Sequence, residues 1–122
     1  MYRILIVDDE HIVAETLSMI FAQQGFSTCT AYSTDEALER ASAFTPDLLL
    51  CDLNMPEKDG TALISAMDGV YPRCRVLVLT GSATGVSRVG ALSSRLRKQL
   101  SILSKPCPPS EVLAVAGALL AA

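Results

Sequence analysis

Five polar residues with useful chemistry each follow a short apolar run in this sequence. Asp8 and Asp9 follow ILIV, Asp52 follows LLLC, Thr80 follows VLVL, and Lys105 follows SILS. Carboxylates can bind a cation or attack an electrophile, and a hydroxyl and an ammonium can hold an anionic group. Whether these side chains act together depends on the elements that position them.

The apolar runs indicate strands that are buried on both faces. Residues 4–7, 48–51 and 76–79 are too few to form helices, and they do not alternate with polar residues. Continuous apolar strands are typical of a parallel sheet covered by helices on both faces. Residues 26–32 alternate more, which predicts a strand nearer an edge, and residues 101–104 predict another short strand.

Helical patterns separate these strands. The first, over residues 10–24, is expected to bury one apolar face. That face consists of Ile12, Val13, Leu17, Ile20 and Phe21. Ser33 and Glu36 form a capping-box pattern that begins a second helix, and Asp59 can cap a third. A fourth pattern lies around residues 89–96, and a fifth follows near the C-terminus.

Five strand–helix repeats predict a doubly wound α/β fold, (βα)5, with a five-stranded parallel sheet in the order 2-1-3-4-5. No linker or repeat divides residues 1–122, so we expect a single domain. In such sheets ligands bind beyond the carboxyl ends of the strands. The first and third strands would be neighbours, which brings Asp8, Asp9 and Asp52 together, with Thr80 and Lys105 on the same edge.

Three carboxylates at one edge predict a bound cation. Held within a few ångströms they repel one another, which would raise their pKa values unless a cation lies among them. Oxygen ligands without a nearby His or Cys favour Mg2+ over zinc, and Mg2+ keeps waters that a phosphate can displace. An Asp can also attack phosphorus, a reaction that depends on in-line placement and on neutralising the equatorial oxygens. Mg2+, Lys105 and Thr80 could each take one of these oxygens.

Four motifs in this order resemble the receiver domain of bacterial two-component response regulators. They are ILIVDDE, CDLNMPEKDG, VLVLTG and LSKP, and the resemblance covers nearly the whole chain. It implies a flavodoxin-like fold. It also implies that Asp52 accepts a phosphoryl group from a phosphohistidine on a sensor histidine kinase or a histidine phosphotransfer protein, in a phosphorelay that depends on Mg2+.

The same resemblance implies roles for the other residues. The metal ligands would be Asp8, Asp9, Asp52 and, through its backbone carbonyl, Asn54. Thr80 would move toward the new phosphate, and Lys105 would pair with it beside a cis bond to Pro106. Gly60 is expected to permit a backbone geometry that a side chain would strain. The only chemistry implied is self-phosphorylation and autodephosphorylation, so the domain is not expected to be an enzyme.

Two departures from the family pattern concern the residues that would transmit phosphorylation of Asp52 to a partner protein. Ile102 stands three residues before Lys105, where the family usually has Tyr or Phe, which puts the usual coupling of hydroxyl movement to aromatic burial in doubt. The fourth helix is basic. Its segment carries Arg88, Arg95, Arg97 and Lys98 and no acid. We interpret it either as a solvated face or as a docking surface, since a downstream protein could bind the face of the fourth helix, fifth strand and fifth helix.

A degenerate receiver is the main alternative: a docking module that keeps the fold without phosphorylation, as Ile102 and the basic helix would allow. A dehalogenase-like phosphatase is disfavoured because its second Asp should follow a nucleophile on the first strand, whereas Asn54 follows Asp52 on the third. A flavodoxin-like carrier is disfavoured because the acids of residues 8–11 would repel a flavin phosphate.

Charge and composition narrow the partners. Residues 1–70 hold twelve acids and three bases, or −9, and the remainder holds seven bases and one acid, or +6, which sum to the net −3. A domain that binds nucleic acid directly would be basic as a whole, so no such contact is expected. No apolar stretch reaches the roughly 20 residues of a membrane span, and no signal peptide begins the chain, which predicts a cytoplasmic protein without membrane contact.

The four cysteines have no C-x-x-C spacing, and the chain has a single His, so neither a zinc site nor a disulfide framework is expected. We interpret them as small core residues of a protein in a reducing compartment. Cys51 adjoins Asp52, however, and could make that position sensitive to oxidation.

Overall fold

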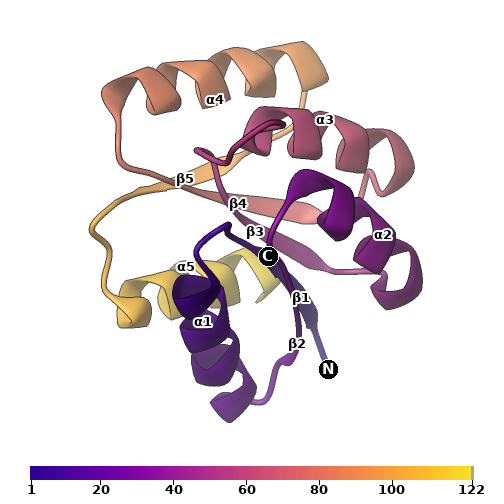
Figure 1. Ribbon diagram of the computed structural model, residues 1–122, viewed down its shortest axis with the longest axis vertical. Helices are drawn as coiled ribbons and strands as arrows, with labels where there is room; N and C mark the ends of the chain where they lie inside the picture. The colour runs from indigo at the N-terminus through magenta and orange to yellow at the C-terminus, as the bar shows by residue number, and fades with distance from the viewer. Residues whose placement is uncertain (122) are drawn as a thin grey trace.

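The computed structural model describes residues 1–121, which form one five-stranded parallel sheet with helices on both faces (Figure 1). The strands are β1 (Arg3–Val7), β2 (Ser27–Ala31), β3 (Leu48–Asp52), β4 (Arg75–Thr80) and β5 (Ser101–Ser104). Their order in the sheet is β2-β1-β3-β4-β5, which confirms the predicted order and the edge position of the second strand.

Five helices connect and cover the strands. They are α1 (His11–Gln23), α2 (Thr34–Phe44), α3 (Gly60–Val70), α4 (Ala83–Leu96) and α5 (Pro109–Ala121). The helices α1 and α5 pack on one face of the sheet, and α2, α3 and α4 pack on the other (Figure 1). No helix of the described chain is both long and apolar enough to cross a membrane.

The buried central strand explains why its sequence is apolar at successive positions. All five residues of β3 are buried. Leu48 and Leu50 enter the cluster beneath α1 and α5, whereas Leu49 and Cys51 enter the cluster beneath α2, α3 and α4. A strand that contributes to two cores cannot alternate apolar and polar residues, so the continuous run is a direct result of the layered architecture.

The predicted starts of α2 and α3 are confirmed, with one difference in detail. Ser33 Oγ accepts a hydrogen bond from Glu36 N–H (3.1 Å), and Asp59 accepts bonds from the first turn of α3. The Glu36 carboxylate, however, accepts from Tyr32 N–H (3.1 Å) instead of the N–H of Ser33. The Glu36 side chain therefore binds the first residue after β2, one position before the N-cap residue that a capping box would use.

The prediction for the buried face of α1 was wrong at Ile12, whose side chain is 81% exposed. The buried residues of this helix are Ala14, Leu17 and Phe21, at spacings of three and four. Because successive helical residues turn by about 100°, a residue two positions before Ala14 points away from that line. Apolar character alone did not reveal which side of the helix faces the sheet.

Gly60 is required by close packing and not by an unusual backbone angle. Positive φ angles in the described chain occur at Thr45, Glu57, Arg97 and Gly25, and Gly60 is not among them. A Cβ atom at Gly60 would lie 2.9 Å from both the carbonyl oxygen of Asp52 and the Cα of Leu53. The start of α3 thus packs directly on the backbone at the end of β3, which corrects the expected reason for this glycine.

Replacing Gly60 with Ala is therefore expected to lower the free energy of unfolding by about 1–3 kcal/mol, because the added methyl overlaps backbone atoms that cannot move independently. Gly90→Ala in α4 is the matched control, since a Cβ there meets no atom within 4 Å. The control should raise stability by about 0.5–1 kcal/mol through helix propensity. Urea unfolding followed by circular dichroism measures both, and equal stability of Gly60→Ala and the wild type would contradict the packing argument.

Candidate functional site

Three carboxylates meet at the carboxyl ends of β1 and β3, as the strand order predicted. Asp8 and Asp9 directly follow β1, and Asp52 is the last residue of β3. One carboxylate oxygen from each lies within 4.8 Å of the others. Asp8 and Asp52 are only 2% and 6% exposed, whereas Asp9 is half-buried. The strand pairing produces this cluster, because Val7 lies opposite Cys51 in the register of β1 and β3.

Backbone hydrogen bonds hold one oxygen of each of two carboxylates, and the second oxygen of Asp8 has no hydrogen bond among the described residues. Asp8 Oδ1 accepts from Glu10 N–H (2.9 Å), and Asp52 Oδ1 accepts from Asn54 N–H (3.2 Å). Asp8 Oδ2 is buried without a hydrogen-bond partner among residues 1–121. Burial raises the pKa of Asp8, and the nearby charge of Asp52 raises it further. A buried oxygen in this condition is costly unless a cation approaches it.

Lys105 supplies one cation to this cluster. Its Nζ lies 3.2 Å from Asp52 Oδ2 and 3.8 Å from Asp8 Oδ2. Its backbone N–H donates to the carbonyl of Thr80 (2.8 Å), so it continues the β4–β5 pairing, and its bond to Pro106 is cis, as the resemblance implied. Burial alone would lower the pKa of Lys105, but the carboxylates of Asp52 and Asp8 raise it above its ordinary value. The ammonium is therefore held in its charged form.

The donor set fits a hard divalent cation. Three ionised carboxylates and one ammonium leave a formal charge of −2, which one divalent ion would balance. All the donor atoms of the cluster are oxygens, and oxygen ligands suit Mg2+. Asn54 is exposed and contacts Asp52 through its N–H. The use of its carbonyl as a metal ligand stays a prediction.

Thr80 lies on the same edge, but its hydroxyl is directed toward α4. It is fully buried, and its Oγ1 accepts from Ser82 N–H (3.4 Å). No hydrogen bond joins it to Asp52 in the described part of the chain. A Cβ atom at Gly85 would overlap Thr80 Oγ1 and approach Leu53 Cδ2 to 2.9 Å. Sequence analysis missed Gly85, although a glycine in the first turn of a helix was a usable sign of close packing.

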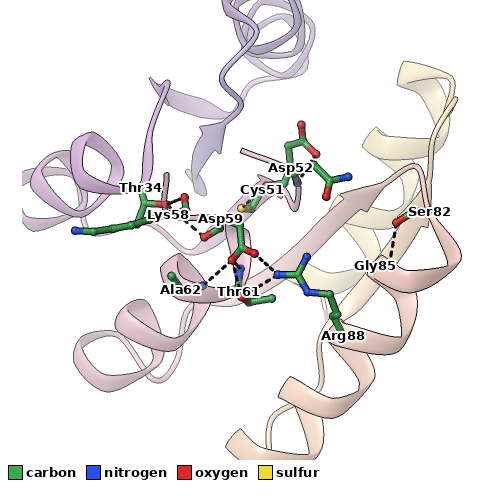
Figure 2. A network of polar contacts seen from close by, with 11 residues as sticks. Thr34, Cys51, Asp52, Lys58, Asp59, Thr61, Ala62, Ser82, Gly85 and Arg88 are labelled. Atoms are coloured by element: carbon green, nitrogen blue, oxygen red, sulfur yellow. Dashed lines mark hydrogen bonds and ion pairs between the residues drawn. The ribbon is translucent and has the colours of Figure 1, made fainter. Parts of the chain in front are cut away.

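The basic residues of α4 and its C-terminal end bind α3, which neither interpretation of the basic helix anticipated. The pairs are Arg88 with Asp59, Arg95 with Ser65 Oγ (3.0 Å) and Lys98 with Asp68 (3.3 Å). Figure 2 shows the guanidinium of Arg88 reaching the Asp59 carboxylate. Acids from residues 1–70 thus neutralise bases from the remainder of the chain, between two neighbouring helices. Arg97 remains exposed beyond the helix.

The environment of Cys51 argues against sensitivity to oxidation. Its side chain is fully buried, and its Sγ donates to the carbonyl of Asp52 (3.2 Å). Burial and the negative charge of Asp52 raise the pKa of this thiol far above its ordinary value. Because the thiolate is the reactive form, Cys51 serves as a small core residue within β3, next to Asp52. All four cysteines are free.

Comparison with known proteins agrees with this architecture. The family model for the response regulator receiver domain matches residues 4–116. Response regulator MprA of Mycobacterium tuberculosis is 34% identical over 118 residues, covering 97% of this chain and 50% of that protein. Regulatory protein AtoC of Escherichia coli is 41% identical over 90 residues, covering 74% of this chain and 20% of that protein. The chain therefore spans half or less of the length of these relatives.

Solved structures share the fold over nearly the whole chain. The chemotaxis protein CheY4 of Vibrio cholerae has a TM-score of 0.85 at 25% identity and covers 97% of this chain and 98% of its own. A CheY-like receiver domain protein from Methanospirillum hungatei has a TM-score of 0.86 at 24% identity, covering 98% and 94%, which supports the flavodoxin-like fold. Since the family match extends over residues 4–116, this chain belongs to the receiver domains of two-component response regulators.

Proposed function

We propose that this domain is a phosphorylation switch in which Asp52 accepts a phosphoryl group from a phosphohistidine in a reaction that depends on Mg2+. The donor would be a sensor histidine kinase or a histidine phosphotransfer protein, in keeping with the family of response regulators. One observation carries the proposal: the Asp52 carboxylate has an oxygen within 4.8 Å of two further carboxylates and lies 3.2 Å from the Lys105 ammonium.

In this reaction an Asp52 oxygen forms a bond to phosphorus while the bond from phosphorus to the histidine nitrogen breaks. The donor imidazole leaves with the electron pair of that bond, so no external reductant or oxidant is needed. Lys105 keeps its proton, because two carboxylates raise its pKa, and can pair with a phosphoryl oxygen. Mg2+, when held by Asp8, Asp9, Asp52 and the backbone carbonyl of Asn54, would supply positive charge against another oxygen.

Thr80 would bind the phosphoryl group only after a change of side-chain direction. Its hydroxyl now lies against the first turn of α4. Turning it toward Asp52 would place a donor on a third oxygen, and would at the same time alter the contact with α4. Later hydrolysis of the aspartyl phosphate returns the domain to its starting state, so its chemistry is directed at itself and not at a further substrate. A downstream protein would bind the face formed by α4, β5 and α5 and distinguish the two states of the domain.

Ile102 is the residue that favours the alternative, a degenerate receiver that docks without phosphorylation. It is half-buried against the core beneath α4 and carries no hydroxyl. The intact acid cluster, Lys105 and Thr80 favour the switch. The two functions differ in magnesium binding, since a degenerate site should show no saturable binding of Mg2+.

Acetyl phosphate with Mg2+ is expected to add one phosphoryl group to the wild-type domain and none to Asp52→Asn, because that amide cannot act as the nucleophile. Asp68→Asn is the matched control: it removes a carboxylate of α3 that pairs with Lys98, away from the acceptor. Intact-mass spectrometry measures the added group. Absence of phosphorylation in the wild type, or an equal mass change in Asp52→Asn, would contradict the proposal.

Asp8→Asn is expected to stabilise the domain by about 1–3 kcal/mol in the absence of Mg2+, because it removes a buried charge that Lys105, at 3.8 Å, offsets only in part. In the wild type, Mg2+ at about 100 times its dissociation constant should add about 2.7 kcal/mol, and this gain should be lost in the variant. Urea unfolding with and without Mg2+ measures both effects.

The same variant gives a pH test. Because the folded pKa of Asp8 is raised above its ordinary 3.8, stability from its protonated form is fully present below 3.8 and is lost as pH rises through the folded value. Without Mg2+, the wild type should lose stability over this window relative to Asp8→Asn. A difference that stays constant with pH would show that the charge of Asp8 is already compensated within the protein.

A further inference from the structure

We propose that the Asp59–Arg88 ion pair couples the acceptor loop, residues 53–59, to α4, and that Arg88 is the positioning residue through which the state of Asp52 reaches this helix. The inference rests on the proposed phosphorylation of Asp52. In this family an aromatic residue usually helps to connect the acceptor to the output face. This chain has Ile102 at that position, and we assign the connection between Asp52 and α4 to Arg88 instead.

The carboxylate of Asp59 connects α3 to α4 (Figure 2). Its Oδ1 accepts from Thr61 N–H (3.0 Å), from the Thr61 hydroxyl (2.6 Å) and from Ala62 N–H (3.3 Å), and these bonds cap α3. Its Oδ2 binds the guanidinium of Arg88. Because each oxygen has its own partners, a displacement of Asp59 must move the start of α3, the side chain of Arg88, or both.

The acceptor loop is short and closed on itself, so a change at Asp52 reaches Asp59 directly. Gly60 N–H donates to the carbonyl of Leu53 (2.9 Å), which joins the two ends of the loop. Gly60 also packs so tightly on Asp52 and Leu53 that no methyl group fits between them. The contacts that connect Asp52 to Arg88 are therefore backbone contacts and one carboxylate, and their close packing leaves the loop little freedom to move.

The far side of the loop is attached to α2, which limits the directions in which it can move. The Thr34 hydroxyl, which is buried, donates to the carbonyl of Lys58 (2.7 Å) (Figure 2). Lys58 Nζ binds Asp35 (2.8 Å). With Lys58 held on this side, the Arg88 ion pair is the loop's charged connection to α4, in addition to the packing of Leu53 against Gly85. A displacement at the acceptor is thus passed to the helix of the proposed output face.

A second contact acts on the same part of α4. Thr80 Oγ1 lies against Gly85, which is one helical turn before Arg88, and it also accepts from Ser82 N–H. Rotation of Thr80 toward a phosphoryl group would remove both contacts. Two contacts thus connect Asp52 to the first two turns of α4. One runs through Thr80 at the end of β4, and the other runs through Asp59 at the end of the acceptor loop. Ile102, an apolar residue packed on the core, can form hydrogen bonds with neither.

Hydrogen exchange of α4 measures this coupling in the intact domain. We would compare residues 83–96 with and without acetyl phosphate and Mg2+ in the wild type, Arg88→Ala, Arg88→Lys and Arg95→Ala. Arg95 is the matched control because it is another arginine of α4 that binds α3, at Ser65 (3.0 Å), outside the acceptor loop. Intact mass reports the occupancy of Asp52 in every sample.

Arg88→Ala should be phosphorylated like the wild type. The change in α4 exchange on phosphorylation should be about two- to fivefold smaller than in the wild type, because a partly exposed ion pair contributes a free energy of that order. Arg88→Lys should restore part of it, and Arg95→Ala should keep it. A full α4 response in phosphorylated Arg88→Ala, or no response in the phosphorylated wild type, overturns this inference and leaves the proposed phosphorylation standing. A wild type that is never phosphorylated overturns the proposed function and, with it, this inference.

Discussion

The mutual repulsion of Asp8, Asp9 and Asp52 is the constraint on which the rest of the site depends. Parallel pairing of β1 with β3 forces these carboxylates to one edge of the sheet, and burial removes most of the water that would otherwise screen them. Lys105 offsets part of the charge from the opposite side. A fully buried strand can end on a carboxylate if a cation binds there, and the proposed Mg2+ would recover the cost of burying the charge.

Charge also organises the helices on one face of the sheet. The sequence has an acidic first part and a basic second part. In the structure the opposite charges meet at Asp59 with Arg88 and at Asp68 with Lys98, along the boundary between α3 and α4. Exposed ion pairs contribute little to stability individually. Their value here lies in fixing the position of α4 relative to the loop that follows Asp52.

The sheet and the acid cluster could be predicted from sequence because both depend on short-range patterns. Apolar runs of fixed length define the strands, and the polar residues that follow them must lie at one edge once the strands are parallel. The partners of Arg88 could not be predicted, because they depend on the packing of two helices whose contacts lie 29 residues apart. Ile12 and Gly85 depend in the same way on how each helix is rotated, which an apolar residue or a glycine alone does not determine.

The closure of the loop between β3 and α3 has a consequence for the length of the chain at this point. Surface connections commonly tolerate inserted or deleted residues. This one cannot easily do so, because the hydrogen bond from Gly60 to Leu53 and the contact with α2 at Lys58 fix both its span and its path. Natural or engineered variation in loop length should therefore avoid residues 53–59.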